Sequence, residues 1–380
     1  MNKYDRNLFW AICILVLFGT VMIYSASSVT SAHKFGDPMF FLKRQIVRVI
    51  IGFGALYLGL RIDYHFWQKY AFWGIIAVCG LLLLPLIPQL AGMHAVKGAN
   101  RWVKLFGSST LQPSEIAKFA LVVYLAEECS RRQQLLSSFK DGVLTIMIPV
   151  AVLLGIIVLQ PNFGMVMGLF MVAVAMLIVV GVPFRHFIYL GVPSIATLGV
   201  LMMTSHHALM RLKAFFLHSD PLGDGYQALQ SLIALGSGGI FGLGLGQGKQ
   251  KVFYLPEAHT DFIFSVIGEE LGLIGTSILV FLFAYIAWRG LRIVLRAPDR
   301  FGAYLAFGIT SVYVFFALIN LGVVTRLIPT TGIPLPFVSY GGSQLVVHMF
   351  IGGVLLNISS AVRMPSTKPA LELIGEKCVI

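Results

Sequence analysis

Titratable side chains gather at the start of an apolar run in the segment YLPEAHTDFIFSVIGEELG, which spans residues 254–272. Glu257, His259 and Asp261 lie close together, and the run from 261 to 289 predicts a membrane helix. A negative charge such as Asp261 is stabilised at a helix N-terminus by a few tenths to about 1 kcal/mol, so it could simply complement the helix end. Partial desolvation would instead raise its pKa toward the range of a general base. The residues alone leave both interpretations open.

Two further carboxylates, Glu269 and Glu270, follow deeper in the same predicted helix. They lie about 12 to 13 Å along the helix axis from Asp261. Helical geometry places Ser265 and Gly268 below Asp261, Glu269 to the side and Glu270 on the opposite face. Because an unpaired charge at that depth is costly, we expect both glutamates to face protein, water or a cation, or to be protonated.

A glycine-rich run, GSGGIFGLGLGQGKQK, precedes this segment at residues 236–251. A dinucleotide fingerprint would need a strand before it and a helix after it in a βαβ unit, and neither is predicted here. The free backbone N–H groups, with Lys249 and Lys251 beside them, could form a loop that holds a phosphate. Plain loop flexibility explains the glycines equally well.

Two neighbouring segments carry further charge. GANRWVKLFG supplies Arg101, Trp102 and Lys104, a tryptophan between two cations at the predicted membrane interface, where a lone tryptophan is more often a belt residue than a ligand. LQPSEIAKFAL places Glu115 and Lys118 three residues apart, on neighbouring positions of a helix that Pro113 opens. We interpret these two as an internal ion pair, or as partners of the site near Asp261.

The last long loop, RLIPTTGIPLPFVSYGGSQL, has three prolines in eight residues and ends at Gly341-Gly342-Ser343, where the next helix begins. The prolines favour a stiff, extended path. Such a segment can line a cavity without moving, or serve as a rigid connector.

The elements that must position these residues are membrane helices. Of 380 residues, 57% are hydrophobic and 12% charged, with a mean hydropathy of +0.85, far above an ordinary soluble domain. We predict an all-α fold, a polytopic transmembrane helical bundle of about ten spans with long extracytoplasmic loops. The first run exceeds a signal-peptide core and is read as an uncleaved span despite the small residues Ser25-Ala26-Ser27. The predicted spans are 8–27, 44–61, 70–88, 113–129, 142–160, 163–182, 184–204, 261–289, 301–324 and 344–362.

The basic residues bear on topology and on partners. The net charge of +12 is scattered singly or in pairs, which argues against a nucleic-acid partner and for membrane lipids. Lys and Arg divide almost evenly between the two sides of a ten-span topology. Clusters at Arg131-Arg132 and at 289–300 flank short loops, so both termini are predicted to be cytoplasmic. Bases on the outer face suit an anionic extracytoplasmic ligand, although each could also anchor a helix end to lipid headgroups.

Four segments, taken in order, resemble the SEDS family (shape, elongation, division and sporulation) of bacterial peptidoglycan glycosyltransferases. They are KGANRW, LQPSEIAKF, YLPEAHTDFIFSVIGEELG and TTGIPLPFVSYGGS. The sequence YLPEAHTDFIF is more similar to the division member of the family than to the elongation member. The resemblance implies a membrane domain over residues 1–365 in the cytoplasmic (inner) membrane, followed by a short cytoplasmic tail, 366–380.

The resemblance also implies an activity, the polymerisation of lipid II at the outer face of that membrane. Asp261 matches the essential aspartate of the family and would be the catalytic base. The cations available for the pyrophosphate leaving group are Arg101, Lys104, Lys118, Lys249 and Lys251. Trp102, Glu115, His259 and Ser343 complete the predicted substrate-binding set. No cofactor is firmly implied, although a divalent cation, Mg²⁺ or Mn²⁺, could assist.

Other functions remain open at this stage. A lipid II flippase could use Glu115, Lys118, Glu269 and Glu270 as a polar pathway. The chain could also be a scaffold that recruits a synthase, or a polymerase specific to elongation or sporulation. The resemblance implies a class B penicillin-binding protein as partner, and further division proteins are expected.

Overall fold

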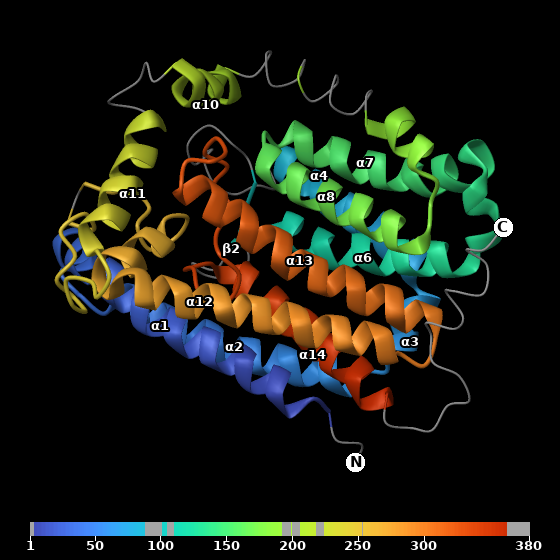
Figure 1. Cartoon of the computed structure of the whole chain (residues 1–380), viewed down its shortest axis with the longest axis horizontal. Coiled ribbons are helices and arrows are strands. Elements are labelled where there is room, and N and C mark those ends of the chain that lie inside the picture. Colours follow the sequence, from blue (N-terminus) through green and yellow to red (C-terminus); the bar gives the residue numbers. More distant parts are fainter. Residues whose placement is uncertain are drawn as a thin grey trace.

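The computed structural model describes residues 4–87, 101–104, 110–191, 199, 206–217, 224–252 and 254–362. This part is almost entirely helical (Figure 1), with one short antiparallel pair, β1 and β2, in which Val103 faces Leu111 and Lys104 faces Thr110. The elements are α1 (Arg6–Phe35), α2 (Phe40–Arg61), α3 (Tyr64–Lys69), α4 (Ala71–Leu83), β1 (Val103–Lys104), β2 (Thr110–Leu111), α6 (Pro113–Arg131), α7 (Thr145–Leu159), α8 (Phe163–Val180), α10 (His206–Leu217), α11 (Asp224–Gly238), α12 (Ile263–Arg296), α13 (Arg300–Val324) and α14 (Gly342–Ala361).

Six helical segments of the described chain are long and apolar enough to cross a membrane: α1, Phe139–Leu159, α8, α12, α13 and α14. The segment Phe139–Leu159 is α7 extended by one π-helical stretch, Phe139–Leu144. α2 and α6 match predicted spans in length but carry more charged residues, and α4 is shorter than predicted. The predicted span 184–204 is helical up to residue 191, and most of its remainder lies outside the described residues. The all-α polytopic membrane fold is confirmed.

Several predicted boundaries are corrected. α1 continues to Phe35, so Ser25-Ala26-Ser27 lies buried within a helix that packs against α12. The break at Gly181 is a true helix end, because Gly181 adopts a left-handed conformation (φ 92°) that closes α8. α10 and α11 have no counterpart among the predicted spans.

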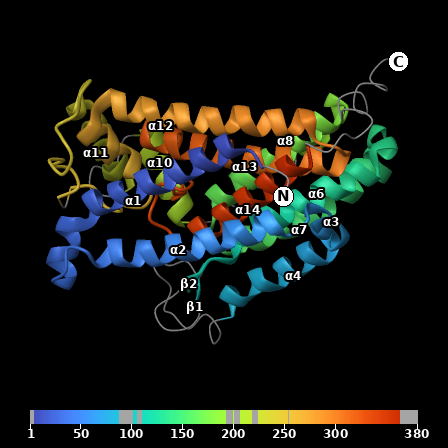
Figure 2. The same ribbon diagram turned by 90° about the horizontal axis from the view of Figure 1, so that it is seen from below.

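α13 is the central helix of the bundle (Figures 1 and 2). It contacts α6 and α8 on one side and α12 and α14 on the other, and nearly three-quarters of its residues are buried. α1 and α2 lie along α12 and α14, while α4 and α7 cover α6 and α8. α13 is buried because helices surround it and pack apolar side chains against it.

The two ends of the bundle differ. α10, α11 and the chain leading into α12 gather at one end, which we call the loop end (left in Figure 1). Tyr4 and Val362, at the two described ends of the chain, line one pocket at the opposite end, which we call the termini end. The backbone N–H of Asp5 donates to Ser359 Oγ at 3.0 Å, which joins α1 to α14 there. An even number of membrane crossings between the two ends of the chain accounts for this.

α12 is broken near its start by Gly272, whose backbone (φ 65°, ψ −160°) is not helical. The glycine-rich segment lies against this break. Leu243 and Gly244 donate N–H bonds to the carbonyls of Glu269 and Glu270, and a Cβ on Gly272 would lie 2.4 Å from Gly242 N. The glycines at 242 and 272 are therefore needed for close backbone contact, not for a mobile loop.

We predict that Gly59→Ala lowers the thermal stability of the protein by disrupting the α2–α14 contact. A Cβ at Gly59 would lie 2.4 Å from the carbonyl oxygen of Phe350, and overpacking of this kind costs about 1 to 3 kcal/mol. Gly54→Ala on the same helix is the control, since nothing lies within 4 Å of its added Cβ. Melting in detergent, followed by size-exclusion chromatography, measures the difference. Equal melting temperatures for the two variants would contradict the close contact.

Candidate functional site

A cavity of 370 Å³ opens at the loop end and contains Asp261 in its wall. Its charged lining residues are two carboxylates and three guanidinium groups, contributed by Glu257, Asp261, Arg48, Arg101 and Arg211. They come from α2, from the segment before β1, from α10 and from the turn before α12. Residues that are far apart in the chain therefore meet around one carboxylate.

Asp261 precedes α12 and does not belong to it, because the helix begins at Ile263. A tight turn holds it: the N–H and the Oγ1 of Thr260 both donate to the carbonyl of Glu257 at 3.1 Å. Glu257 itself has a left-handed backbone (φ 57°), an uncommon conformation for a side chain of this kind. The helical-face prediction for Ser265 and Gly268 relative to Asp261 is therefore wrong.

The proline-rich last loop fixes Asp261 from the other side. Asn320 Nδ2 on α13 donates to the carbonyls of both Asp261 and Ile333 at 2.8 Å. Gly332 (φ 68°) lies beside the carboxylate, since a Cβ there would be 3.4 Å from Asp261 Oδ2. Pro334, Gly332 and Tyr340 line the cavity. Of the two interpretations of this loop, the structure confirms that it lines a cavity.

The three arginines are each held by a different contact. The Arg48 guanidinium stacks on the Tyr340 ring at 4.3 Å from its centroid, and Arg211 donates to the Thr330 carbonyl at 3.4 Å. Arg101 donates from Nε to the Gln160 carbonyl at 3.1 Å and also bonds the Pro161 carbonyl, at the end of α7. Carbonyls and an aromatic ring therefore help to orient all three guanidinium groups.

Arg101 and Asp261 are also coupled electrostatically. Burial, together with the positive charge of Arg211, lowers the pKa of Arg101 to about 10, and the negative charge of Asp261 opposes this shift. Arg101 stays cationic at neutral pH. The cavity thus presents positive charge around a carboxylate, an arrangement suited to an anionic ligand that must also lose a proton.

Of the predicted substrate-binding residues, Arg101 and Trp102 line the cavity. The backbone of Lys104 lies in β1, two residues after Trp102, and its side chain is outside the described part. The hairpin β1–β2 leads directly into α6, so it carries Arg101 and Trp102 back to the cavity rim.

Glu115 and Lys118 form the predicted internal ion pair. Lys118 Nζ lies 2.7 Å from Glu115 Oε2, and each side chain is 1% exposed. Lys118 also lies over the Phe316 ring at 4.0 Å and 3.5 Å from His348 Nε2. The pair is enclosed by α6, α13 and α14, so it is not open to a ligand in the cavity.

His259 and Ser343 have structural partners near the cavity but are not in its lining. The His259 ring packs against Phe41 and Tyr340, with ring centroids 4.4 and 5.5 Å apart, and its carbonyl accepts the Tyr340 N–H at 2.9 Å. Ser343 Oγ accepts the backbone N–H of Gln112 at 3.1 Å. Both residues connect the walls of the cavity to each other.

Lys251 does not reach the cavity. It is 3% exposed, and its Nζ lies 2.5 Å from Glu270 Oε1 and 3.1 Å from Ser25 Oγ on α1. Ser25 in turn donates to Glu270 Oε2 at 2.6 Å, so the triad is closed. Its charge is balanced inside the protein, which argues against the predicted role as a phosphate ligand.

The glycine-rich loop does bind an anion, but that anion is the protein's own Glu269. The backbone N–H groups of Lys249 and Gln250 donate to Glu269 Oε1 at 2.7 and 3.1 Å. The Lys249 side chain is exposed. Glu269 and Glu270 both meet the segment around Gly248. The expectation that each would face a partner in the protein is confirmed.

Arg48, Arg211, Tyr340 and Gln344 line the cavity and were not among the predicted site residues. For Arg48 the sequence held a signal, because Lys43, Arg44 and Arg48 fall in the first turns of α2 with no acidic residue among them. The others are brought in by loops whose path only packing defines. No group of three or more His, Cys, Asp or Glu side chains that could hold a metal occurs within the described residues.

Comparison with known proteins agrees with the fold and the motifs. The family model of the FtsW/RodA/SpoVE cell cycle proteins matches residues 6–364. A probable peptidoglycan glycosyltransferase FtsW from Geobacter sulfurreducens (strain DL-1 / KN400) is 43% identical over 364 residues, covering 96% of this chain and 97% of that protein. Stage V sporulation protein E from Bacillus subtilis (strain 168) is 40% identical over 347 residues, covering 91% and 94%.

Among solved structures, a chain described under "Structural coordination of polymerization and crosslinking by a peptidoglycan synthase complex" shares the fold. Its TM-score is 0.75 at 24% identity, covering 95% of this chain and 99% of that one. The class is thus a polytopic α-helical membrane protein with an acidic and arginine-lined cavity at one end. The chain belongs to the FtsW/RodA/SpoVE family of cell cycle proteins, the family that the four sequence motifs predicted.

We predict that His259 makes the stability of the protein depend on pH. Burial lowers the pKa of His259 from 6.5 to about 4, with Lys34 adding to the shift and Glu257 opposing it. As the pH falls, His259 is protonated in the unfolded chain at a higher pH than in the folded chain. The free energy of unfolding is therefore highest above pH 6.5 and decreases between pH 6.5 and 4. The loss is at most about 3 kcal/mol.

His259→Gln removes the titrating group and should flatten the melting temperature over this pH window. His65→Gln, which replaces an exposed histidine at the termini end, is the control. The same slope in wild type and His259→Gln would rule out the role of burial.

Proposed function

We propose that this chain is a peptidoglycan glycosyltransferase that polymerises lipid II, with Asp261 as the general base. The observation that carries the proposal is the cavity at the loop end, in which Asp261 shares a single space with Glu257 and three arginines. Family membership supplies the class of reaction, since the Geobacter relative is named a probable peptidoglycan glycosyltransferase. Family membership thus supports the proposed glycosyl transfer, and the cavity supports the proposed roles of Asp261 and the arginines.

The proposed chemistry requires one base and several cations. The 4-hydroxyl of an N-acetylglucosamine loses its proton as it attacks C1 of the donor N-acetylmuramic acid, with inversion, and Asp261 accepts the proton. Undecaprenyl pyrophosphate leaves already charged, so positive charge is needed there and a strong acid is not. Arg48, Arg101 and Arg211 can meet the phosphates bidentately, which lysine cannot do.

The structure changes the proposed substrate-binding set. Arg48 and Arg211 join Arg101, Trp102 and Lys104, whereas Lys118 and Lys251 are assigned to internal ion pairs. Glu115, His259 and Ser343 support the walls of the cavity, and Lys249 remains an exposed cation outside its lining. A divalent cation, Mg²⁺ or Mn²⁺, would take the substrate phosphates as additional ligands, because two carboxylates line the cavity among the residues that the structure describes.

The proposed setting is the cytoplasmic membrane of a bacterium, with the loop end on its outer side. Both described chain ends lie at the termini end, where Arg289, Arg292, Arg296 and Arg300 cluster beside a short loop, as the positive-inside rule favours for a cytoplasmic face. The domain would span residues 1–365, with 366–380 as a cytoplasmic tail. A septal role in division is proposed because the Geobacter relative is named FtsW, although kinship to the sporulation protein keeps other roles open.

The flippase alternative has no specific support. Its polar pathway would need Glu115, Lys118, Glu269 and Glu270 to face a route across the bundle. Instead all four are at most 1% exposed, and each contacts a neighbour in the protein. Movement of a polar headgroup past them would break two buried ion pairs.

We also propose that the chain works with a class B penicillin-binding protein. Glycosyl transfer alone yields strands without cross-links, and the solved chain of similar fold comes from a peptidoglycan synthase complex. The partner's outer domain would contact the loop end near α10 and α11, because Arg211 on α10 lies in the cavity wall. Further division proteins are expected in the same assembly.

We predict that Asp261→Asn leaves the protein folded and lowers strand synthesis from lipid II by about 10² to 10⁴-fold, the usual contribution of a general base. Asparagine keeps the shape but cannot accept the proton. Asp141→Asn, the same change at an exposed site at the start of α7, is the control. Gel analysis of labelled glycan strands, at equal melting temperatures, gives the answer. Wild-type synthesis by Asp261→Asn would exclude it as the base.

We predict that adding the class B partner increases polymerisation by the reconstituted chain several-fold. Contact at the loop end would fix α10, and with it Arg211, against the cavity. Strand synthesis is compared with and without the partner at equal protein-to-lipid ratios, with a transpeptidase-inactive partner as the control for cross-linking. An equal rate with and without the partner would remove the proposed activation, and failure to co-purify in mild detergent would remove the complex itself.

A further inference from the structure

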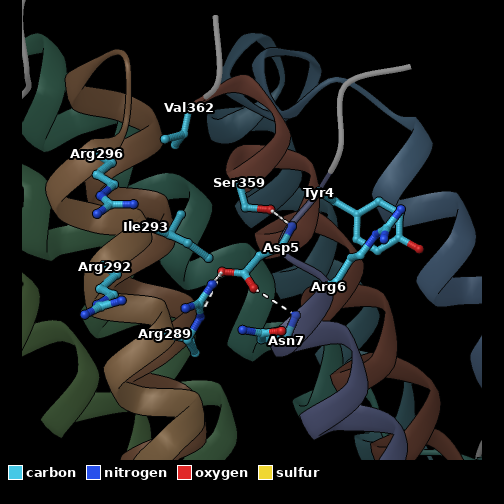
Figure 3. Close-up of a pocket in the computed structure, with 10 residues that line it drawn as sticks. All are labelled: Tyr4, Asp5, Arg6, Asn7, Arg289, Arg292, Ile293, Arg296, Ser359 and Val362. Atoms are coloured by element: carbon cyan, nitrogen blue, oxygen red, sulfur yellow. Dashed lines mark hydrogen bonds and ion pairs between the residues drawn. The ribbon is translucent and has the colours of Figure 1, made fainter.

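A second polar cavity, of 330 Å³, lies at the termini end, far from Asp261 (Figure 3). Among the described residues, four arginines and one carboxylate line it: Arg6 from α1, Arg289, Arg292 and Arg296 from α12, and Asp5. The three α12 arginines follow one stripe of the helix, at spacings of three and four residues. A cavity of this size falls within the usual range for ligand sites, about 300 to 1,000 Å³.

The carboxylate of Asp5 is occupied by hydrogen bonds and an ion pair within the protein. Its carboxylate accepts the N–H groups of Asn7 and Leu8 at 3.1 Å, as the N-cap of α1, and it pairs with the Arg289 guanidinium (Figure 3). The two side chains of that pair are 11% and 18% exposed. With the Asp5–Ser359 bond, this network fixes α1, α12 and α14 to one another. It neutralises one of the four arginines.

The other three guanidinium groups have no acidic partner in the part of the chain that the structure describes. Arg6, Arg292 and Arg296 are exposed, and Arg292 is held over the Trp288 ring at 3.8 Å from its centroid. Like charges gathered at one cavity repel each other, and an anion placed between them would relieve that repulsion. Helix C-termini favour cations, which accounts for Arg296, but Arg6 lies in the first turn of α1, where the dipole disfavours a cation.

An apolar cavity of 560 Å³ adjoins the polar one. The two share Tyr4, and adjacent residues of α14, Ser359 and Ser360, line one cavity each. The apolar cavity lies between α1 and α2, and its wall is formed mainly by Phe9, Phe53, Leu56, Tyr57 and Leu60. The arginine cluster therefore lies next to an apolar cleft on the outside of a membrane bundle.

We propose that these two cavities together bind one anionic phospholipid. The headgroup phosphate would lie among Arg6, Arg292 and Arg296, and one acyl chain would lie in the cleft between α1 and α2. Basic pockets between membrane helices hold anionic headgroups, and each nearby Lys or Arg adds to the attraction. A free phosphate would satisfy the arginines but would leave the apolar cleft without an occupant, which favours the lipid.

Native mass spectrometry of the full-length chain in detergent, titrated with phosphatidylglycerol or phosphatidylcholine, tests the proposal. We expect tight binding of one phosphatidylglycerol and weak binding of phosphatidylcholine. Arg292→Gln/Arg296→Gln should weaken the phosphatidylglycerol affinity by about tenfold or more. The matched control, Lys140→Gln/Arg185→Gln, removes two exposed cations from the same end of the bundle and should retain the wild-type affinity.

Three outcomes would overturn the proposal. An equal loss in the control pair would mean that binding reports only total charge. Equal affinities for the two lipids would remove the anion from the site. Displacement of phosphatidylglycerol by millimolar inorganic phosphate would identify a site for free phosphate instead. If the double variant does not elute as a single species, Arg6→Gln alone, which leaves the Asp5–Arg289 pair intact, supplies the same comparison.

Discussion

An ionised group inside a membrane bundle must find its counter-charge or its hydrogen bonds within the protein, and the arrangement of this chain follows from that constraint. In the described part of the chain, three carboxylates are at most 1% exposed, and each meets a different kind of donor. Glu115 pairs with Lys118 on the same helix, Glu270 with a lysine from the glycine-rich loop, and Glu269 with two backbone N–H groups of that loop. Removing any one donor would leave a buried charge unpaired, at a cost of several kcal/mol.

The same constraint explains why the glycine-rich loop has a defined structure. It supplies Lys251 and two amides to the glutamates, and it also hydrogen-bonds the carbonyls that the break at Gly272 frees in α12. Ordering so many glycines carries an entropic cost, which these hydrogen bonds offset. The loop thus fixes the start of α12, and the turn that precedes α12 carries Asp261. Charge balance in the bundle and the position of the candidate base are coupled through one helix.

α12 also links two regions of excess positive charge. At its start, three arginines surround a cavity with Asp261 in the wall, and at its end three more face a cavity whose carboxylate is already paired. In both places the guanidinium groups are oriented by carbonyls, by aromatic rings or by Asp5, the N-cap residue of α1. These contacts set direction without cancelling charge at most of the arginines. Both cavities are therefore built for anions, one at each end of the bundle.

The sequence by itself determined the membrane class, most of the spans and the family, and it singled out Asp261 as the candidate base, because hydropathy and short motifs are local properties. The sequence also indicated that Glu115 and Lys118 could pair, since residues three positions apart on a helix are neighbours on its surface. Only the tertiary structure decided which cations meet Asp261. Lys251 had the right charge and loop but is neutralised by Glu270, whereas Arg48 and Arg211 reach the cavity from α2 and α10. The position of Asp261 outside α12 was equally undecided, because a turn closed by Thr260 and Asn320 depends on α13 and the last loop. Contacts between distant segments have no period or spacing in the sequence, and packing alone selects them.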